Sequence, residues 1–267
     1  MTDTSNLDDM PDSYKDLLAQ LDGETKPTQD DTPKTNKLSI RDKVFRKIVD
    51  GAEIAQLTQQ ELDVVIVKTG AISRLFYKGE YRSGVGSQPT CWSADVRTGT
   101  PCPDVPEGNR QNPTCFDCTQ NIKGSGGQSS RACKYRQRIA VMLVDSEGQI
   151  TSQDVYQLDL SGVSVFGRDQ KRMSMQGYAK YLNTHQCPLA SVITNISFDN
   201  TTHLPKLIFT PKRALEKEEL SLVAYLQKDA NTKALVELNI KPHKELHQDV
   251  DSVFGVVTGE GVYKTGN

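Results

Sequence analysis

The stretch Leu62-Asp63-Val64-Val65-Ile66-Val67-Lys68 carries the clearest structural signal in the chain. It is rich in β-branched aliphatic residues, which are typical of a strand buried inside a sheet. Thr69-Gly70 follows as a turn signal, and residues 72–78 (Ile-Ser-Arg-Leu-Phe-Tyr-Lys) form a second strand pattern. The sequence therefore predicts two neighbouring strands joined by a turn, with a sheet built around them.

Shorter patterns extend the prediction in both directions. Further strands are predicted over residues 138–144, 153–160, 189–198, 204–210 and 232–239. The pair that flanks Asp199-Asn200 is expected to be antiparallel. Helices are predicted over residues 38–50, 167–184 and 215–228. Because strands and helices do not alternate regularly, the pattern favours a mostly β, α+β barrel over a doubly wound parallel sheet.

Length and composition limit the class of protein. The chain has 267 residues, of which 36% are hydrophobic and 25% charged, which suits one domain with tails or insertions. No apolar run reaches the roughly 18 residues of a membrane helix, and Met1–Asp12 lacks the apolar core of a secretory signal. We therefore expect a cytoplasmic protein with no membrane partner. Its six cysteines are then metal ligands or free thiols rather than disulfides.

The net charge of −2 conceals an asymmetry. Residues 1–36 contain nine acidic and three basic side chains, a net charge of −6, whereas the rest of the chain carries +4. Acidic segments of this kind are typically disordered and often contact partners. We expect a disordered acidic tail over 1–36, one domain over 37–240, and a flexible segment over 241–267.

Residues 79–135 form an insertion of a different kind. They are rich in Gly, Pro, Ser, Thr and Asn and have almost no aliphatic runs, so they need a stabiliser other than a hydrophobic core. Cys115-Phe116-Asp117-Cys118 is a C-x2-C knuckle, with Cys91 before it and Cys133 after it. Four thiolates form a closed, structural zinc site, which can contribute about 10–16 kcal/mol in small peptides. We therefore predict that Cys91, Cys115, Cys118 and Cys133 bind zinc.

Two alternatives to this ligand set stay open. Cys102 could replace Cys91 as the fourth ligand, whereas Cys187 fits a buried free thiol better. The same four thiolates could also hold an iron–sulfur cluster, although zinc is the preferred interpretation.

Basic and aromatic residues interleave around the insertion. Residues 64–140 hold eleven bases and five acids. Cations that follow phosphates and flat rings that stack on unpaired bases are the two chemistries that single-stranded nucleic acid requires. A second basic stretch, Arg168 to Arg172, opens the helix predicted over 167–184. The candidate contact residues are Arg74, Tyr77, Lys78, Tyr81, Arg82, Trp92, Lys134, Tyr135, Arg136, Arg138, Arg168, Lys171 and Arg172.

Each of these residues has a plainer interpretation. Only one of Phe76 and Tyr77 can be exposed on a regular strand. Trp92 could cover the metal site as a structural lid, and Arg168 to Arg172 could be a solvated helix end. The sequence carries no phosphate-binding loop, no G-x-S-x-G, no H-E-x-x-H and no deaminase-type H-x-E, so nothing in it supports catalysis.

Several of these motifs together resemble a known family. Cys91-Trp92-Ser93, the knuckle, Asn121, Gly124-Ser125 and Arg131-Ala132-Cys133 follow one another as in phage and prophage single-stranded DNA-binding proteins with a cysteine-rich insertion. Residues 178–182, 192–194 and 205–211 are also similar, so that the resemblance spans about residues 62–225. It differs at Asp95-Val96 and Thr119, where the family often has Asp-Gly and Pro.

The resemblance implies an OB-like five-stranded barrel with a four-cysteine zinc insertion and a groove for single-stranded DNA. It also implies a non-enzymatic role in phage replication or recombination, in the bacterial host cytoplasm. The chain does not end in the acidic tail common in that family, so the N-terminal acidic segment is our candidate contact for replication or recombination proteins. The alternatives are a zinc-ribbon interaction protein with weak nucleic-acid contact and, less favoured, an iron–sulfur enzyme.

Overall fold

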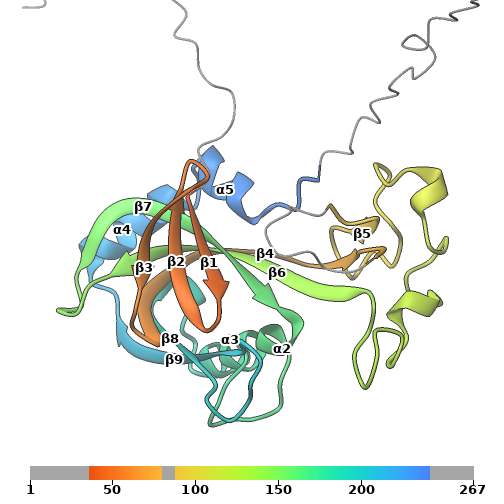
Figure 1. The fold of residues 1–267 in the computed structure, drawn as a ribbon. Helices are drawn as coiled ribbons and strands as arrows, with labels where there is room; N and C mark the ends of the chain where they lie inside the picture. The colour runs from red at the N-terminus through yellow and green to blue at the C-terminus, as the bar shows by residue number, and fades with distance from the viewer. Residues whose placement is uncertain (1–35, 80–87, 241–267) are drawn as a thin grey trace, which may run out of the picture.

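The computed structural model describes residues 36–79 and 88–240, a mostly β structure with a few helices (Figure 1). This confirms the fold class at that level. The strands are β1 (Lys37–Arg41), β2 (Val44–Val49), β3 (Ala52–Leu57), β4 (Glu61–Phe76), β5 (Cys91–Ser93), β6 (Lys134–Val144), β7 (Ile150–Ser161), β8 (Val192–Phe198) and β9 (Leu207–Ala214). The helices are α2 (Gly162–Val165), α3 (Met175–Thr184), α4 (Lys217–Leu226) and α5 (Ala230–Val236).

The strands form one curled sheet rather than a closed barrel. Its order is β3-β2-β1-β7-β6-β4-β8-β9, with β5 paired to β4, and β1–β7 is the parallel pair among antiparallel ones. Curling brings Phe45 of β2 and Phe198 of β8 to a ring-centroid distance of 4.7 Å, although their strands are far apart in the sheet order. Over the described residues β3 and β9 are edges, so the sheet does not close into the predicted five-stranded barrel.

The helix predicted over residues 38–50 is also wrong, because this stretch forms the β1–β2 hairpin and the turn into β3. Asp42 and Lys43 both have positive φ, as do Asp50 and Gly51. Paired left-handed residues are typical of tight two-residue hairpin turns. The Asp50-Gly51 dipeptide is the hairpin signal in the sequence, and the apolar spacing of Val44, Phe45, Ile48 and Val49 conceals it.

The two strands predicted over 62–78 form a single strand, β4, and Thr69-Gly70 is not a turn. The ladder between β4 and β6 shifts register between Thr69 and Ile72, and this irregularity lets the strand continue. A Cβ at Gly70 would lie 2.2 Å from the carbonyl oxygen of Val236 in α5. Gly70 therefore allows a close approach of two backbones instead of a chain reversal.

The remaining predictions divide between correct elements and wrong ones. The antiparallel pair is confirmed as β8–β9, and the strands predicted over 138–144 and 153–160 lie within β6 and β7. The helix over 215–228 is confirmed as α4, whereas that over 167–184 begins only at Met175, after the Ser174 cap. The last predicted strand, 232–239, is wrong because Asp229 caps α5 there by accepting from the Thr232 N–H.

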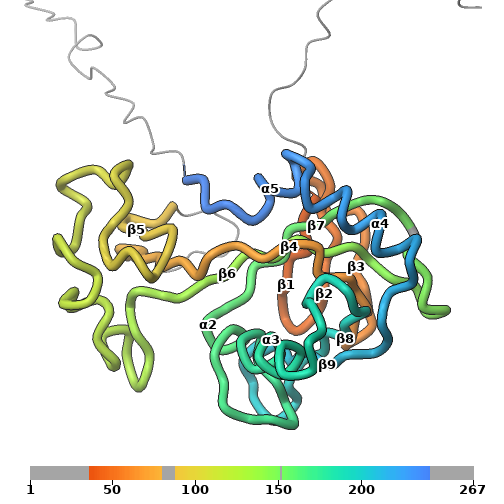
Figure 2. Tube along the Cα trace, turned by 180° about the vertical axis from the view of Figure 1, so that it is seen from behind, coloured from red at the N-terminus to blue at the C-terminus, as the bar shows by residue number. Residues whose placement is uncertain are grey.

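The centre of the sheet is buried on both faces. Val64 and Ile66 pack into one hydrophobic cluster with Tyr178 and Leu182 of α3, while Val65 and Val67 pack into another with Val223 and Leu226 of α4. Figure 2 shows α3 and α4 on different sides of the curled sheet. This double cover explains why the run Val64 to Val67 has no polar alternation.

The insertion stands beside the sheet rather than in it (Figure 1). Over residues 88–133 its regular structure consists of β5 and two short 3-10 turns, Glu107–Asn109 and Thr119–Asn121. Its small apolar cluster combines Trp92 and Val105 with Leu75 and Phe76 from the end of β4. The insertion is therefore anchored to the sheet by β4.

Three further predictions fall outside the described residues: the disordered tail over 1–36 (except Asn36), the flexible segment over 241–267, and the contact residues Tyr81 and Arg82. Among the helices of the described part, none is long and apolar enough to cross a membrane.

Candidate functional site

The four cysteines proposed as ligands line one small pocket. Cys91, Cys115, Cys118 and Cys133 surround a cavity of about 20 Å³, which we call the cysteine pocket. Cys102 is not among its lining residues, and its Sγ instead accepts a hydrogen bond of 3.2 Å from the Ala94 N–H. The structure thus groups Cys91, rather than Cys102, with the knuckle and Cys133.

Backbone hydrogen bonds of the insertion hold the cysteine pocket together. The Cys115 N–H donates to the Gly99 carbonyl at 2.7 Å, and the Cys133 N–H donates to the Gln120 carbonyl at 2.8 Å. Asn121 bridges the knuckle: its side-chain amide donates to the Cys115 carbonyl at 2.9 Å, and its backbone N–H donates to the Cys118 carbonyl at 2.9 Å. Segments with little regular structure therefore acquire a defined shape around the thiols.

The thiols surround the pocket but are not arranged closely enough to coordinate an ion. Over residues 36–79 and 88–240, no three His, Cys, Asp or Glu side chains are close enough together to hold a metal ion. All six cysteines are free. Burial raises the pKa of the Cys91 thiol, and burial together with the neighbouring cysteines raises the pKa of Cys133 to about 12. A metal ion would therefore have to displace protons from these thiols on binding.

Arg74 supplies an independent test of whether a metal fits here. Its side chain is 5% exposed and lines the cysteine pocket, and its Nε and Nη1 have no hydrogen-bond partner among the described residues. Burying an unpaired cation is costly. Zinc with four thiolates carries a net charge of about −2 and would supply the missing counter-charge. The chemistry of the donor set and the buried guanidinium therefore fits a thiolate–metal centre, although the thiols would have to move closer together to bind the ion.

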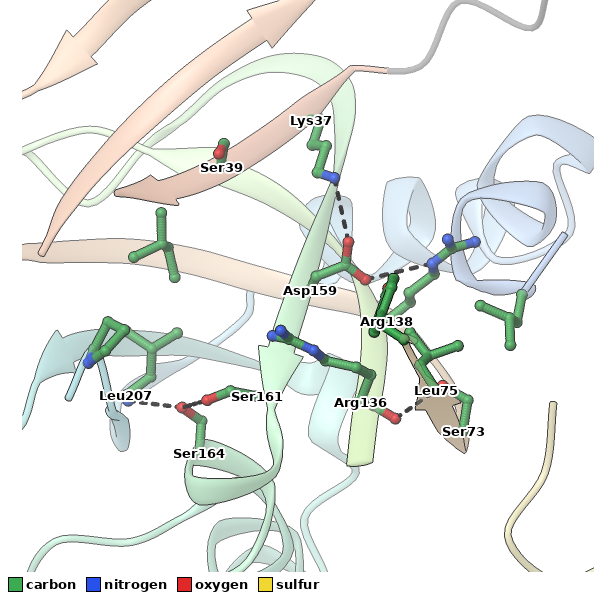
Figure 3. A pocket seen from close by; sticks show the side chains of 14 residues that line it. Lys37, Ser39, Ser73, Leu75, Arg136, Arg138, Asp159, Ser161, Ser164 and Leu207 are labelled. Atoms are coloured by element: carbon green, nitrogen blue, oxygen red, sulfur yellow. Dashed lines mark hydrogen bonds and ion pairs between the residues drawn. The ribbon is translucent and has the colours of Figure 1, made fainter. Parts of the chain in front are cut away.

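A second, larger cavity crosses β1, β4, β6 and β7 and has a volume of about 540 Å³ (Figure 3). We call it the basic pocket. Three of its lining residues are basic (Lys37, Arg136 and Arg138) and one is acidic (Asp159). Four serines and Tyr77 add hydroxyl groups. Its other polar and apolar lining residues are Ser39, Ile40, Ser73, Leu75, Ser161, Ser164, Pro205, Leu207 and Leu238.

Strand register aligns the polar residues of the basic pocket. Ser73 of β4 is opposite Arg136 of β6, and Arg136 is opposite Ser161 of β7. Residues that face each other across an antiparallel ladder present their side chains on the same face. Arg136 therefore stands in a row of hydroxyl-bearing neighbours, and the next row contains Arg138 opposite Asp159.

The three bases of the basic pocket differ in how they are paired. Asp159 lies between two of them, 3.3 Å from the Lys37 ammonium and 3.4 Å from the Arg138 guanidinium. Arg138 also donates to the carbonyl of Glu237. Within the described part of the chain, the Arg136 guanidinium has no ion-pair partner, and Figure 3 shows it extending across the cavity. Arg136 is thus the cation best placed to receive an anionic ligand.

The other candidate contact residues lie in three different environments. Trp92 and Arg74 are buried beside the cysteine pocket. Lys78 and Lys134 are exposed near the ends of β4 and β6. Arg168, Lys171 and Arg172 lie between α2 and α3 and do not line the basic pocket, and Arg172 is paired with Asp169 at 2.8 Å. The basic pocket therefore brings together Tyr77, Arg136 and Arg138.

Sequence reasoning missed the contributions of Lys37, Ser39, Ser161 and Ser164 to this pocket. The helix predicted over 38–50 conceals the strand that carries Lys37 and Ser39. Small polar residues on strands give no signal of their own. An alternation of Lys37, Ser39 and Arg41 with Leu38 and Ile40 is the available indication of a strand with one polar face.

A scan against protein-family models and searches of the curated proteins and of the solved structures found no match to this chain.

Proposed function

We propose that this protein binds single-stranded DNA in the basic pocket, as a binding protein rather than an enzyme. The observation that carries the proposal is the unpaired Arg136 guanidinium in a cavity that crosses four strands and also presents Lys37, Arg138 and Tyr77. Cations held on a rigid sheet can follow a phosphate backbone, and a tyrosine ring can stack on an unpaired base. The binding should be largely independent of sequence.

The fold supports this proposal at a coarse level. A curled, mostly antiparallel sheet with a ligand cavity across its strands is the arrangement that OB-folds use for oligonucleotides. We propose that the domain is a divergent, open OB-like sheet, and that its role lies in the replication or recombination of a phage genome. The acidic segment, which we propose contacts partner proteins, lies outside the described residues.

We further propose that zinc occupies the cysteine pocket as a structural ion. Cys91, Cys115, Cys118 and Cys133 would hold it, and a bound zinc ion would cross-link β5, the knuckle and the start of β6. Asn121 would keep the knuckle in place through its hydrogen bonds to Cys115 and Cys118. The Arg74 guanidinium would face the negative charge of the thiolates.

Fluorescence anisotropy with a labelled single-stranded oligonucleotide and its duplex, across a salt series, tests the binding proposal. We expect tighter, more salt-dependent binding to the single strand. Arg136→Gln should weaken that binding roughly tenfold and lower the salt slope by about 1, since one phosphate contact is lost. The matched control is Lys228→Gln, which removes an exposed base just after α4, outside the basic pocket.

Two outcomes would contradict the proposal. Equal and weak binding to single strand and duplex would favour the alternative, an interaction protein whose insertion contacts other proteins. An unchanged salt slope in Arg136→Gln, with the variant folded, would exclude the basic pocket as the site of phosphate contact.

A further inference from the structure

A row of aromatic rings lies on the face of the sheet opposite the basic pocket. In the β4–β6 ladder Ser73 is opposite Arg136, whereas the next residue, Arg74, is opposite Tyr135. Successive residues of a strand point to opposite faces, so Tyr135 faces away from Arg136. Tyr135 therefore does not line the basic pocket, although the sequence analysis names it as a candidate contact residue.

Three chain segments contribute to this row. Phe166, at the end of α2, meets Tyr135 edge-on with ring centroids 5.3 Å apart. The Arg74 guanidinium carbon lies 5.5 Å from the Tyr135 ring and 5.5 Å from the Phe116 ring of the knuckle. We call Phe116, Tyr135 and Phe166 the aromatic row. It runs from the insertion to α2 and is continuous through Arg74.

The aromatic row is exposed where a ligand could reach it. Phe116 is 66% exposed and Phe166 is 39% exposed, although neither side chain has a polar group to hydrate. Single exposed hydrophobic residues are ordinary on protein surfaces. Two exposed phenylalanines that continue a partly buried tyrosine form a larger apolar surface, and such a surface indicates a binding partner.

Two of the three rings, Phe116 and Tyr135, are also held in position by the backbone and by a hydrogen bond. A Cβ on Gly99 would lie 2.1 Å from the Phe116 ring, so this ring packs directly on backbone. The Tyr135 hydroxyl donates to the Asn121 side-chain oxygen at 3.2 Å, and Gly162 packs against the Tyr135 backbone. Fixed rings lose little conformational freedom on binding, which favours affinity.

The charges beside the row indicate what it binds. The exposed Arg131 places its guanidinium carbon 5.7 Å from the Tyr135 ring, and Arg74 lies beneath the row. The one acidic neighbour in the knuckle, Asp117, accepts a hydrogen bond from the Thr114 hydroxyl at 3.1 Å. Flat rings with guanidinium groups beside them match unpaired nucleobases joined by phosphates.

We propose that the aromatic row is a second contact surface for the single strand, on which unpaired bases stack. The proposal rests on the proposed DNA-binding function and deepens it. The basic pocket would mainly neutralise phosphates, with Tyr77 as its one ring, whereas the aromatic row would contact further bases and so discriminate against a duplex, whose bases are already stacked.

Fluorescence anisotropy of the double variant Phe116→Ala/Phe166→Ala tests this proposal. We expect its affinity for single-stranded DNA to fall roughly 5- to 100-fold with little change in salt slope, because stacking neutralises no phosphate. The matched control is Tyr225→Ala, which removes a ring that is 68% exposed on α4. Phe116→Tyr keeps a ring in place and should retain affinity.

An oligonucleotide with abasic sugars separates stacking from phosphate contact. Wild type should bind it more weakly than the complete strand, and the double variant should bind it as wild type does. If the double variant binds the complete strand with wild-type affinity while Arg136→Gln weakens it, the aromatic row is not a base-stacking surface although DNA binding stands. If the wild type binds no single strand, both proposals are overturned.

Discussion

Arg74 is the residue whose environment most needs an explanation. A guanidinium that is 5% exposed, with two unpaired nitrogens, is costly to bury, and the Phe116 and Tyr135 rings at 5.5 Å offset part of this cost without supplying a counter-charge. Its neighbours in the cysteine pocket are thiols, which are neutral when protonated and anionic when they bind a metal. A thiolate–metal centre beside Arg74 would therefore explain why its guanidinium is buried.

Replacing Arg74 by Met tests this explanation, because Met keeps most of the side-chain length and removes the charge. If the pocket binds zinc, Arg74→Met should lower zinc affinity about 10- to 100-fold, as loss of an outer-shell partner typically does. Arg74→Lys, which keeps a cation, should lose less. Competition with a chromophoric chelator measures the affinity, and cobalt substitution reports on the thiolate ligands through their absorption bands.

Arg97→Met is the matched control, since Arg97 belongs to the same insertion but is 84% exposed and does not line the cysteine pocket. Unchanged zinc affinity in a folded Arg74→Met protein would show that the guanidinium does not serve as the counter-charge.

Asp199 stabilises a different part of the protein, the loop between β8 and β9, through its hydrogen bonds. Its carboxylate accepts from the Lys206 ammonium at 2.7 Å and from the Thr201 hydroxyl at 2.6 Å. These bonds hold the pKa of Asp199 well below its usual value. Because the folded pKa is lower than the unfolded one, about 3.9, the stabilisation is present above about pH 4 and is lost as pH falls further.

Asp199→Asn should therefore lower the free energy of unfolding at pH 7 by about 1–3 kcal/mol, since a charged acceptor of several hydrogen bonds is lost. The loss should become smaller as pH falls below about 4, because the unfolded wild-type chain takes up a proton at this carboxyl there while the folded chain does not. Urea unfolding at pH 7 and pH 3 measures this, with Asp42→Asn as the control because the Asp42 side chain is 84% exposed. An equal loss at both pH values would contradict the assignment.

At the scale of elements, the sequence predicts a strand or helix correctly where hydrophobic burial or capping residues specify it. The run Val64 to Val67 identifies β4, and Glu216 with Glu219 at the start of α4 form the capping box expected of a helix that opens with acidic residues. The predictions are wrong where contacts between distant backbone segments determine the local conformation. Gly70 has the pattern of a turn, yet it is a contact with α5, which lies more than 150 residues away in sequence.

The same distinction applies to the candidate sites. Spacing of cysteines is enough to name four residues that line one pocket. The division of contact residues between two faces could not be predicted, because it depends on the register Ser73–Arg136 and Arg74–Tyr135. A shift of one residue would exchange the two faces. Phe116, which the proposed aromatic row includes, is not a candidate from the sequence because a single Phe between two cysteines carries no pattern of its own.

At the scale of the whole molecule, the sheet and the insertion are stabilised by different means. The sheet has two large apolar clusters covered by α3 and α4 and a small one under α5, whereas the insertion has one small cluster around Trp92 and the cysteine pocket. If zinc occupies the cysteine pocket as proposed, its loss should loosen the insertion and leave the sheet folded. Cooperative unfolding of the β-sheet signal in circular dichroism should persist after chelation.

Trp92 makes this last prediction measurable, because it is the one tryptophan of the chain and is 5% exposed beside Cys91. Cys118→Ser should release zinc and shift the Trp92 emission to longer wavelength as water reaches the ring. Cys187→Ser is the matched control, since Cys187 lies by Ser191, outside the cysteine pocket, and should leave both metal content and emission unchanged. A Cys118→Ser protein that retains zinc and the original emission would show that the knuckle does not hold the metal.

If the β-sheet signal of Cys118→Ser is lost together with its zinc, the sheet and the insertion fold as one unit, and the prediction that the sheet stays folded is wrong.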